Sequence, residues 1–346
     1  MRKGKRLNEE EALFLLLDAD LLALGSTAQA VADDRHPPKI ATFIIDRNIN
    51  YTNICVSRCR FCAFSRDKES KEAYLLSNEE ILSRIKEAVS SGATQVMLQG
   101  GLHPDLSIDY YTELIWEIKK RFSLSIHSFS PPEIVHIANV SHLSVNETLK
   151  RFKEVGLDSL PGGGAEILVD HVRDLISPQK ISSQTWLDVM ATAHSLGMKT
   201  TATMMMGSIE SLEDRVDHLS KIRKLQDKTN GFRAFIPWTY QPGNTELRGR
   251  EASPFDYLRT LAVARLFLDN VENIQGSWLT LGKDIGQITL LFGANDLGSI
   301  MLEENVVRAA GVFHRITEDE MVDLIRRAKR VPAQRDTEYR IVKRYA

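Results

Sequence analysis

Short apolar runs alternate with longer segments of helical period along most of this chain. Runs rich in β-branched and aromatic residues indicate strands, and apolar positions that recur every three or four residues indicate helices between them. Strand after helix in regular succession is typical of a parallel sheet with crossover helices. The predicted strands are residues 40–49, 94–99, 124–129, 157–160, 199–206, 232–238, 272–278 and 287–292.

Helix starts are marked by capping residues. Ser77, Ser144 and Thr317 each stand three residues before a glutamate, which is the spacing of a capping box. Ser253 precedes Pro254, and proline suits the first position of a helix. The predicted helices are residues 9–34 (one helix or a pair), 77–92, 109–122, 144–156, 185–196, 210–227, 253–268 and a last one from 317.

Eight strand–helix units within about 250 residues suit a (β/α)8 barrel better than a doubly wound sheet. We therefore predict an α/β fold in three parts. Residues 1–38 form an N-terminal helical extension, residues 39–300 the barrel, and residues 301–346 a C-terminal helical segment. In such barrels, functional residues gather at the carboxyl ends of the strands.

Composition narrows the possible functions. The 346 residues carry a formal net charge of −2, so no overall positive field attracts nucleic acid. The basic run 326–330 lacks interleaved aromatic residues and is expected to be a solvated helix face. No run approaches eighteen apolar residues, and no cleavable leader follows the basic start, so we expect neither membrane span nor signal peptide. Thiols without a secretion signal fit a reducing cytoplasm.

All three cysteines of the chain, Cys55, Cys59 and Cys62, fall in one short loop after the first predicted strand. A structural zinc site usually needs four ligands in two spaced pairs, and no second pair exists. A [4Fe–4S] cluster is usually held by four cysteines, so three would leave one iron open for chemistry. The alternatives are three free thiols, or a zinc ion completed by a distant histidine.

Two glycine-rich segments follow later strands. Gln99, Gly100 and Gly101 end the second strand, where glycine permits close approach to a ligand or simply a tight turn. Residues 162–164 are three glycines ahead of Glu166. They could form an anion-binding nest, but no Lys-Ser/Thr pair follows, so this is no P-loop. The alternatives for Glu166 are an acceptor for a vicinal diol and a helix-start residue.

Several other polar residues stand at predicted strand ends. His127 and Glu133 are candidate general bases, although histidines in such places are often only hydrogen-bonded. Met204 belongs to a methionine-rich strand whose side chains are expected mainly to fill the apolar core. One residue of that strand can also line an adenine pocket. Polar residues without an evident role in the fold are predicted to bind substrate together with His127: Gln241, Asn244, Asn295 and Asp296.

The cysteine spacing, with Phe61 before the last cysteine, resembles the cluster loop of the radical S-adenosylmethionine (SAM) enzymes. In that superfamily the amino and carboxylate groups of SAM chelate the open iron, and a Gly-Gly pair accepts the methionine amino group. The resemblance therefore implies that the three cysteines hold a [4Fe–4S] cluster. It also implies that SAM is bound by Phe61, Gln99, Gly100, Gly101, Glu166 and Met204.

Six segments together resemble one family, the radical SAM dehypoxanthine futalosine cyclases of the futalosine route to menaquinone. They are residues 53–64, 99–106, 130–134, 161–167, 235–245 and 293–298. Aminofutalosine synthase and the radical SAM halves of F0 synthase share much of this pattern. The resemblance implies cyclisation of dehypoxanthine futalosine, by abstraction of the ribose C4′ hydrogen and addition to the benzoate ring. It also implies an electron donor such as flavodoxin or ferredoxin. The alternative from another class is a non-enzymatic metal- or nucleic-acid-binding protein.

Overall fold

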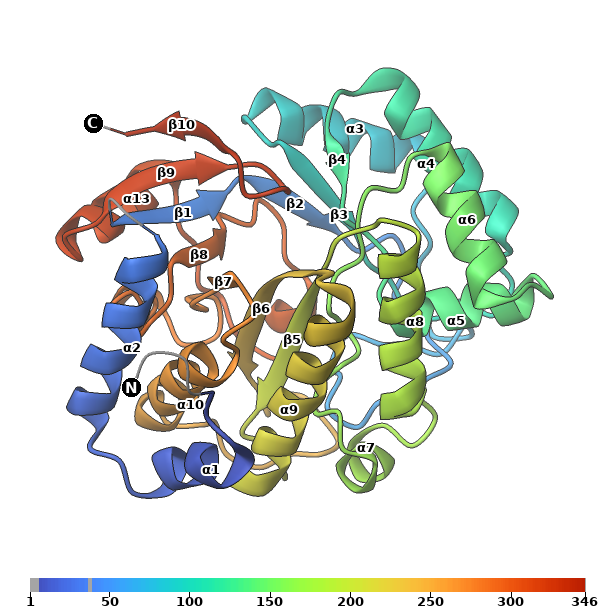
Figure 1. Ribbon diagram of the computed structural model, residues 1–346. Coiled ribbons are helices and arrows are strands. Elements are labelled where there is room, and N and C mark those ends of the chain that lie inside the picture. The colour runs from blue at the N-terminus through green and yellow to red at the C-terminus, as the bar shows by residue number, and fades with distance from the viewer. Residues whose placement is uncertain (1–5, 37–38, 346) are drawn as a thin grey trace.

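The fold is a closed parallel barrel surrounded by helices, as the sequence predicted (Figure 1). The computed structural model describes residues 6–36 and 39–345. Three sheets follow one another around the barrel, with the strand orders β10-β9-β1-β8, β2-β3-β4 and β5-β6-β7. Single parallel bridges join them, from His127 to Ser159, from Leu160 to Thr200 and from Gln275 to Asp296. The ring is closed by β1 and β2, which follow each other directly in the chain and belong to different sheets.

The strands of the barrel are short. Their bounds are β1 (Ile40–Ile44), β2 (Asp46–Ile49), β3 (Gln95–Leu98), β4 (Ser125–Ile126), β5 (Thr200–Met206), β6 (Phe232–Thr239), β7 (Asn273–Ile274) and β8 (Asp296–Ser299). The predicted fourth strand, residues 157–160, takes part only through the bridges of Ser159 and Leu160. The predicted first strand is divided at Ile45 into β1 and β2.

Helices cover the outside of the barrel; in Figure 1, α9 is seen in front of β5, with α8 to its right and α10 to its left. The helices are α1 (Glu9–Leu17), α2 (Leu21–Arg35), α3 (Asn78–Ser90), α4 (Ile108–Arg121), α5 (Pro131–Val140), α6 (Val145–Val155), α7 (Asp170–Ile176), α8 (Ser183–Ser195), α9 (Leu212–Thr229), α10 (Pro254–Phe267), α11 (Lys283–Thr289), α12 (Val306–Ala309) and α13 (Glu318–Arg327). In the part of the chain described here, no helix is both long and apolar enough to cross a bilayer.

The predicted capping boxes are confirmed. Ser77, Ser144 and Thr317 each accept a hydrogen bond from the backbone N–H three residues on, and the glutamate there reaches back to the cap. Each box satisfies N–H groups that have no partner within the helix. The apolar faces that these helices bury against the barrel supply most of their stability. The N-terminal extension is a helix pair, in which α1 packs against α9 and α2 against α10.

The predicted eighth strand, residues 287–292, is wrong. This stretch belongs to α11 and the turn after it, and the eighth strand is β8, a few residues later. A short apolar run does not distinguish a buried strand from one face of a short helix. The correction matters for the site, because Asn295 and Asp296 lie at the start of a strand rather than beyond its end.

The C-terminal segment contains the expected helix α13 and also two strands, β9 (Val331–Arg335) and β10 (Ile341–Arg344). β9 pairs in parallel with β1, and β10 pairs antiparallel with β9. Arg335 on β9 forms a buried ion pair with Asp296 on β8, with 2.7 Å between Nε and Oδ2. The C-terminal segment is therefore part of the barrel's sheet and covers the amino ends of its strands.

Candidate active site

The three cysteines lie in a compact loop that follows β2. Cys59 is buried, and Cys55 and Cys62 are partly exposed. The Cys62 N–H donates to the Cys59 carbonyl at 3.0 Å, and Ser57 Oγ lies 3.3 Å from Cys59 Sγ. The loop is tied to its surroundings through backbone bonds, for example from the Val56 N–H to the Leu102 carbonyl at 3.1 Å.

Gly101 packs directly against this loop. A Cβ atom at Gly101 would lie 2.1 Å from the Ile54 carbonyl oxygen and 2.9 Å from Cys55 Cβ, so only glycine fits. A Cβ atom at Gly100 would lie 2.7 Å from the Tyr51 ring. The Gly-Gly pair and the cysteine loop thus form one surface, and the pair is more than a tight turn.

The buried carboxylate of Glu133 holds Gly100 and Tyr51 in place. Its Oε1 accepts from the Gly100 N–H at 3.0 Å and from Tyr51 Oη at 3.2 Å. Its Oε2 accepts from the N–H and the hydroxyl of Ser130, at 2.8 and 2.6 Å. Burial raises the pKa of Glu133, and these hydrogen bonds oppose the rise. Glu133 does not line the central cavity, so its geometry suits positioning of Gly100 better than the predicted role of general base.

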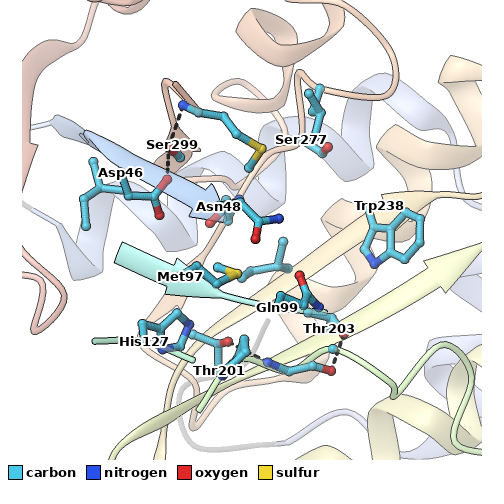
Figure 2. A pocket seen from close by; sticks show the side chains of 18 of the residues that line it. Asp46, Asn48, Met97, Gln99, His127, Thr201, Thr203, Trp238, Ser277 and Ser299 are labelled. Carbon is cyan, nitrogen blue, oxygen red and sulfur yellow. Dashed lines mark hydrogen bonds between the residues drawn. The ribbon is translucent and has the colours of Figure 1, made fainter. Parts of the chain in front are cut away.

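A cavity of about 280 Å³ occupies the barrel interior (Figure 2). Its wall is layered, because Asp46 and Asn48 on β2 pair with Gln95 and Met97 on β3. Asp46 and Gln95 belong to the floor, at the amino ends of the strands, and Asn48 and Met97 to the middle. The upper layer, at the carboxyl ends, contains residues 162–164, Gln99 and Glu166.

Glu166 is prepared to accept further hydrogen bonds. It is 5% exposed, and its Oε1 accepts from Lys180 Nζ at 2.8 Å. Its Oε2 is buried without a partner among the described residues. The backbone of Glu166 has a φ of +39°, which non-glycine residues rarely adopt. A strained, buried carboxylate with a free oxygen at the upper end of a cavity indicates a ligand site.

Lys180 links Glu166 to the cysteine loop, and sequence reasoning missed it. Its ammonium lies 5.1 Å from the centre of the Phe61 ring. Burial would lower the pKa of Lys180, but Cys59 and Glu166 raise it above its ordinary value. Burial raises the pKa of the Cys59 thiol, and Lys180 opposes this rise. A lone lysine between two predicted elements carries no motif, so the sequence offered no sign of this role.

The donor set fits an iron–sulfur cluster better than a single metal ion. Three thiols lie on one loop, and one of them, Cys59, is close enough to the Lys180 ammonium for the positive charge to favour its thiolate. Within residues 6–36 and 39–345, no three cysteine, histidine or acidic side chains group closely enough to hold one ion. In a cubane each cysteine binds a different iron, so its sulfur atoms need not converge on one point.

His127 lies in the middle layer of the cavity and is 6% exposed. Its Nδ1 is 2.7 Å from Ser159 Oγ, and that hydroxyl donates its proton to the Lys199 carbonyl at 2.8 Å. Ser159 must therefore accept from His127, which places the ring proton on Nδ1 and leaves the lone pair on Nε2 free. Burial, together with Arg233 and Arg335, lowers the pKa of His127 well below its ordinary value, so the ring stays neutral.

The remaining predicted cofactor residue, Met204, does not line the cavity. Successive residues of a strand face opposite sides. On β5 the residues that line the cavity are Thr201 and Thr203, and Met204 packs in the apolar core between sheet and helices. The cavity-facing positions could have been chosen from this alternation, but three methionines in a row gave no sign of which face of the strand points inward.

Gln241, Asn244, Asn295 and Asp296 do not line the cavity. Asn295 Oδ1 accepts from Arg265 and the Ile274 N–H, and Asp296 is held by Arg335 and Thr42. Gln241 Nε2 donates to Thr239 Oγ1, and Asn244 Nδ2 donates to the Ala309 carbonyl. These side chains have roles in the fold that sequence alone did not reveal. Polar residues that do line the cavity, and that sequence reasoning missed, include Asn48, Ser277 and Thr280.

Comparison with known proteins identifies the family. Residues 49–222 match the model of the radical SAM superfamily, and residues 229–345 match the CofH/MqnC C-terminal region. A cyclic dehypoxanthine futalosine synthase of Streptomyces coelicolor is 52% identical over 97% of this chain and 86% of its own length. The chain belongs to the radical SAM enzymes, in the family of this synthase. The resemblance drawn from the six sequence segments is thereby confirmed.

Other similar relatives include one enzyme of the same description and one of a different description. The synthase of the same description from Halalkalibacterium halodurans is 46% identical over 99% of this chain and 93% of its own length. A 5-amino-6-(D-ribitylamino)uracil–L-tyrosine 4-hydroxyphenyl transferase of Methanococcoides burtonii is 42% identical over 97% of this chain and 96% of its own.

Solved structures confirm the barrel. Methylornithine synthase has a TM-score of 0.73 at 22% identity and covers 94% of this chain and 93% of its own. The hydrogenase maturase HydG has a TM-score of 0.75 at 18% identity and covers 95% of this chain and 73% of its own. At such low identity these two likenesses establish the fold and nothing further.

Proposed function

We propose that this chain converts dehypoxanthine futalosine into cyclic dehypoxanthine futalosine, in menaquinone biosynthesis. The observation that carries the proposal is the 52% identity, over 97% of the chain, to a synthase named for that product. The site supports it, because a cavity inside a closed barrel lies beside a loop of three cysteines. A reactive radical needs such an enclosed site, from which water and stray reductants are excluded.

Cys55, Cys59 and Cys62 would hold the [4Fe–4S] cluster, and the next residues toward the cavity would hold SAM. When bound, these two cofactors supply the 5′-deoxyadenosyl radical that takes the C4′ hydrogen of the substrate ribose. Glu166 Oε2 is the unpaired acceptor in the upper layer and suits the ribose diol of SAM. The backbone of residues 99–101, at the end of β3, is placed against the cysteine loop for the methionine end of SAM.

Phe61 and Lys180 would complete the cofactor site. The Lys180 ammonium fixes Glu166 Oε1 at 2.8 Å and covers the Phe61 ring. It thereby leaves Glu166 Oε2 free to accept from a ligand. Met204 is not included in the proposed site, because it does not line the cavity.

His127 is the proposed acceptor for the proton that the benzoate ring loses after cyclisation, when the ring radical also gives up one electron, which the oxidised cluster would take. Its Nδ1 proton is committed to Ser159, so Nε2 carries the free lone pair. Its lowered pKa keeps that lone pair unprotonated at neutral pH, which is the form a base requires. Glu133 is the weaker candidate, since all four of its hydrogen bonds hold backbone and neighbouring hydroxyls.

The reaction also needs a one-electron donor. A small flavodoxin or ferredoxin in a reducing cytoplasm would suit a chain whose cysteines are all free thiols. No nucleic acid or membrane takes part in the proposed reaction.

The test is anaerobic incubation of the reconstituted enzyme with SAM, a reductant and dehypoxanthine futalosine, followed by mass spectrometry. We expect the cyclic product and 5′-deoxyadenosine in equal amounts, and neither from the Cys59→Ala variant. Parallel incubations offer tyrosine with 5-amino-6-(D-ribitylamino)uracil, and the substrates of aminofutalosine synthase. Turnover of one of these with no cyclic product would refute the proposal, as would a wild-type protein that carries no iron.

A further inference from the structure

The amide of Asn48 has no hydrogen-bond partner in the described chain, although the residue is only 5% exposed. Its Oδ1 is buried without a donor among the described residues. Nearly all buried side-chain polar groups are hydrogen-bonded, since an unmade bond leaves the desolvation cost uncompensated. Asn48 lines the cavity, and Figure 2 shows its amide projecting into it. A ligand is therefore the partner that this amide lacks.

Other buried polar residues near Asn48 do have partners. Asp46, two residues earlier on the same strand face, accepts from Gln95 and from Ser299. Asn50, two residues later, donates from Nδ2 to the Gln99 carbonyl at 3.0 Å, although its Oδ1 also lacks a donor among the described residues. Asn295 uses both atoms of its amide within the protein. The fold therefore satisfies Asp46 and Asn295 within the chain, whereas Asn48 and Asn50 each keep an unpaired Oδ1, and of these two only Asn48 lines the cavity.

The level of Asn48 in the cavity identifies the part of the ligand that it would meet. Asn48 pairs with Met97, and Gln99 is two residues further toward the carboxyl end of β3. Two residues of a strand span about 6.6 Å, so Asn48 lies one layer beneath Gln99 and the glycines of residues 162–164. A hydrogen atom must come within about 3–3.5 Å of the attacking radical carbon. A group held by Asn48 thus belongs to the part of the substrate next to the reacting carbon.

The chemistry at this level points to an uncharged group. Asn48 is itself uncharged, it pairs with Met97, and the cavity wall also includes the apolar residues Ile44 and Ile236. The cavity-lining arginines already have acidic partners, Arg233 with Glu338 and Arg335 with Asp296. An amide offers one acceptor and one donor side, which matches two adjacent hydroxyls better than a carboxylate.

We propose that Asn48 binds the ribose hydroxyls of the substrate and holds the sugar directly beneath the cofactor. One hydroxyl donates to Oδ1, and a second accepts from Nδ2. This inference rests on the proposed function, because it takes the sugar-bearing substrate from it. It adds a binding residue that none of the sequence motifs contains.

The test compares Asn48→Leu and Asn48→Ala with the wild type in reconstituted enzyme with SAM and no reductant, so that no turnover occurs. We expect the Kd for dehypoxanthine futalosine to rise about ten-fold or more, as for the loss of a hydrogen bond that leaves its partner unpaired. SAM affinity and iron content should remain unchanged. With reductant, both variants should form more 5′-deoxyadenosine per cyclic product than the wild type.

Two further measurements separate binding from a role in the fold. The 2′-deoxy and 3′-deoxy analogues of the substrate should bind more weakly to the wild type, whereas Asn48→Leu should discriminate little against at least one of them. Without substrate, Asn48→Leu should keep or raise Tm, because it removes an unpaired buried group. The matched control Asn295→Leu should lower Tm, since it breaks bonds to Arg265 and Asn273.

The outcomes distinguish this inference from the proposed function. A wild type that forms no cyclic product would remove the proposed function, and the sugar assignment with it. A fully active wild type beside Asn48 variants with unchanged Kd and unchanged coupling would overturn the assignment alone. A fall in Tm as large as that of Asn295→Leu, with unchanged Kd, would make Asn48 a structural residue.

Discussion

Glu166 combines backbone strain, burial and an unpaired oxygen in one residue. Its positive φ costs on the order of 1–3 kcal/mol, and the ion pair with Lys180 helps to hold it in place. The same residue would be unremarkable on a helix surface. Its surroundings therefore favour the diol-binding role over the helix-start role, although both were compatible with the sequence.

Glu166→Gln should weaken SAM binding by about 1.5–3 kcal/mol, because it replaces a charged acceptor. Equilibrium binding of SAM to the reconstituted enzyme without reductant measures this. Lys180→Met is the matched variant, which removes the partner of Oε1 and leaves the carboxylate in place. If Glu166→Gln bound SAM as the wild type does, Glu166 would have no direct contact with the cofactor.

His218 makes the stability of the protein depend on pH. It is fully buried, and its Nδ1 accepts from the Leu168 N–H at 2.9 Å. Burial lowers its pKa to about 3, so the native state stays unprotonated where the unfolded chain, with an ordinary histidine pKa near 6.5, binds a proton. The contribution is complete above about pH 6.5 and is lost as the pH falls toward 3.

Lowering the pH from 7.5 to 5 should therefore reduce the free energy of unfolding by about 2 kcal/mol through His218 alone. Chemical denaturation of the wild type and of His218→Gln at the two pH values measures this. The variant should be less stable at pH 7.5 but should lose less on acidification. Equal losses in both proteins would assign the acid sensitivity to other groups.

At the scale of elements, the link between the end of β3 and the cysteine loop decides the shape of the cofactor site. Gly101 leaves no space for a side chain against the Ile54 carbonyl, and the Gly100 N–H is fixed by Glu133 from α5. Neither the loop nor the strand end could form this surface alone. Helix α5 thus contributes by holding the Gly-Gly pair in position.

Gly101→Ala should reduce iron incorporation severely, because the new Cβ would lie 2.1 Å from a backbone oxygen and displace the loop. Iron analysis and the visible absorbance of the reconstituted protein measure the effect. The control is Gly311→Ala, where a Cβ meets nothing within 4 Å. That variant should show only the usual cost of a positive φ, about 1 kcal/mol, with full iron content. Full iron in Gly101→Ala would contradict the proposed packing.

At the scale of the molecule, the C-terminal strands complete the barrel. In Figure 1, the red strand β9 lies along the blue strand β1. The last part of the sequence therefore pairs with the first. The buried ion pair of Arg335 with Asp296 connects β9 to β8. Removing one partner of such a pair leaves an uncompensated charge, which costs far more than the pair contributes.

Arg335→Met should lower the free energy of unfolding by about 3–5 kcal/mol. The double variant Arg335→Met/Asp296→Leu should recover part of this loss, because it no longer buries a lone carboxylate. Denaturant unfolding of the three proteins measures the difference. A double variant less stable than Arg335→Met alone would show that Asp296 stabilises the fold mainly through Thr42 and the Gly298 N–H.

The sequence by itself determined the barrel, the capped helices and the family, because periodicity, capping boxes and cysteine spacing are local properties of the chain. It predicted that the cysteines, Gly101 and Glu166 lie near one another, since each follows a strand and the carboxyl ends of parallel strands meet. It could not tell that 287–292 belongs to a helix, and this error moved Asn295 and Asp296 to the wrong end of β8.

Tertiary structure alone decided which polar residues are left for a ligand. Asn295, Asp296 and Glu133 bond to partners that are distant along the chain, whereas Asn48 Oδ1 has no donor among the described residues. Hydrogen-bond partners separated by tens or hundreds of residues cannot be inferred from local pattern. The free atoms of a site become visible only once the structural bonds have been accounted for.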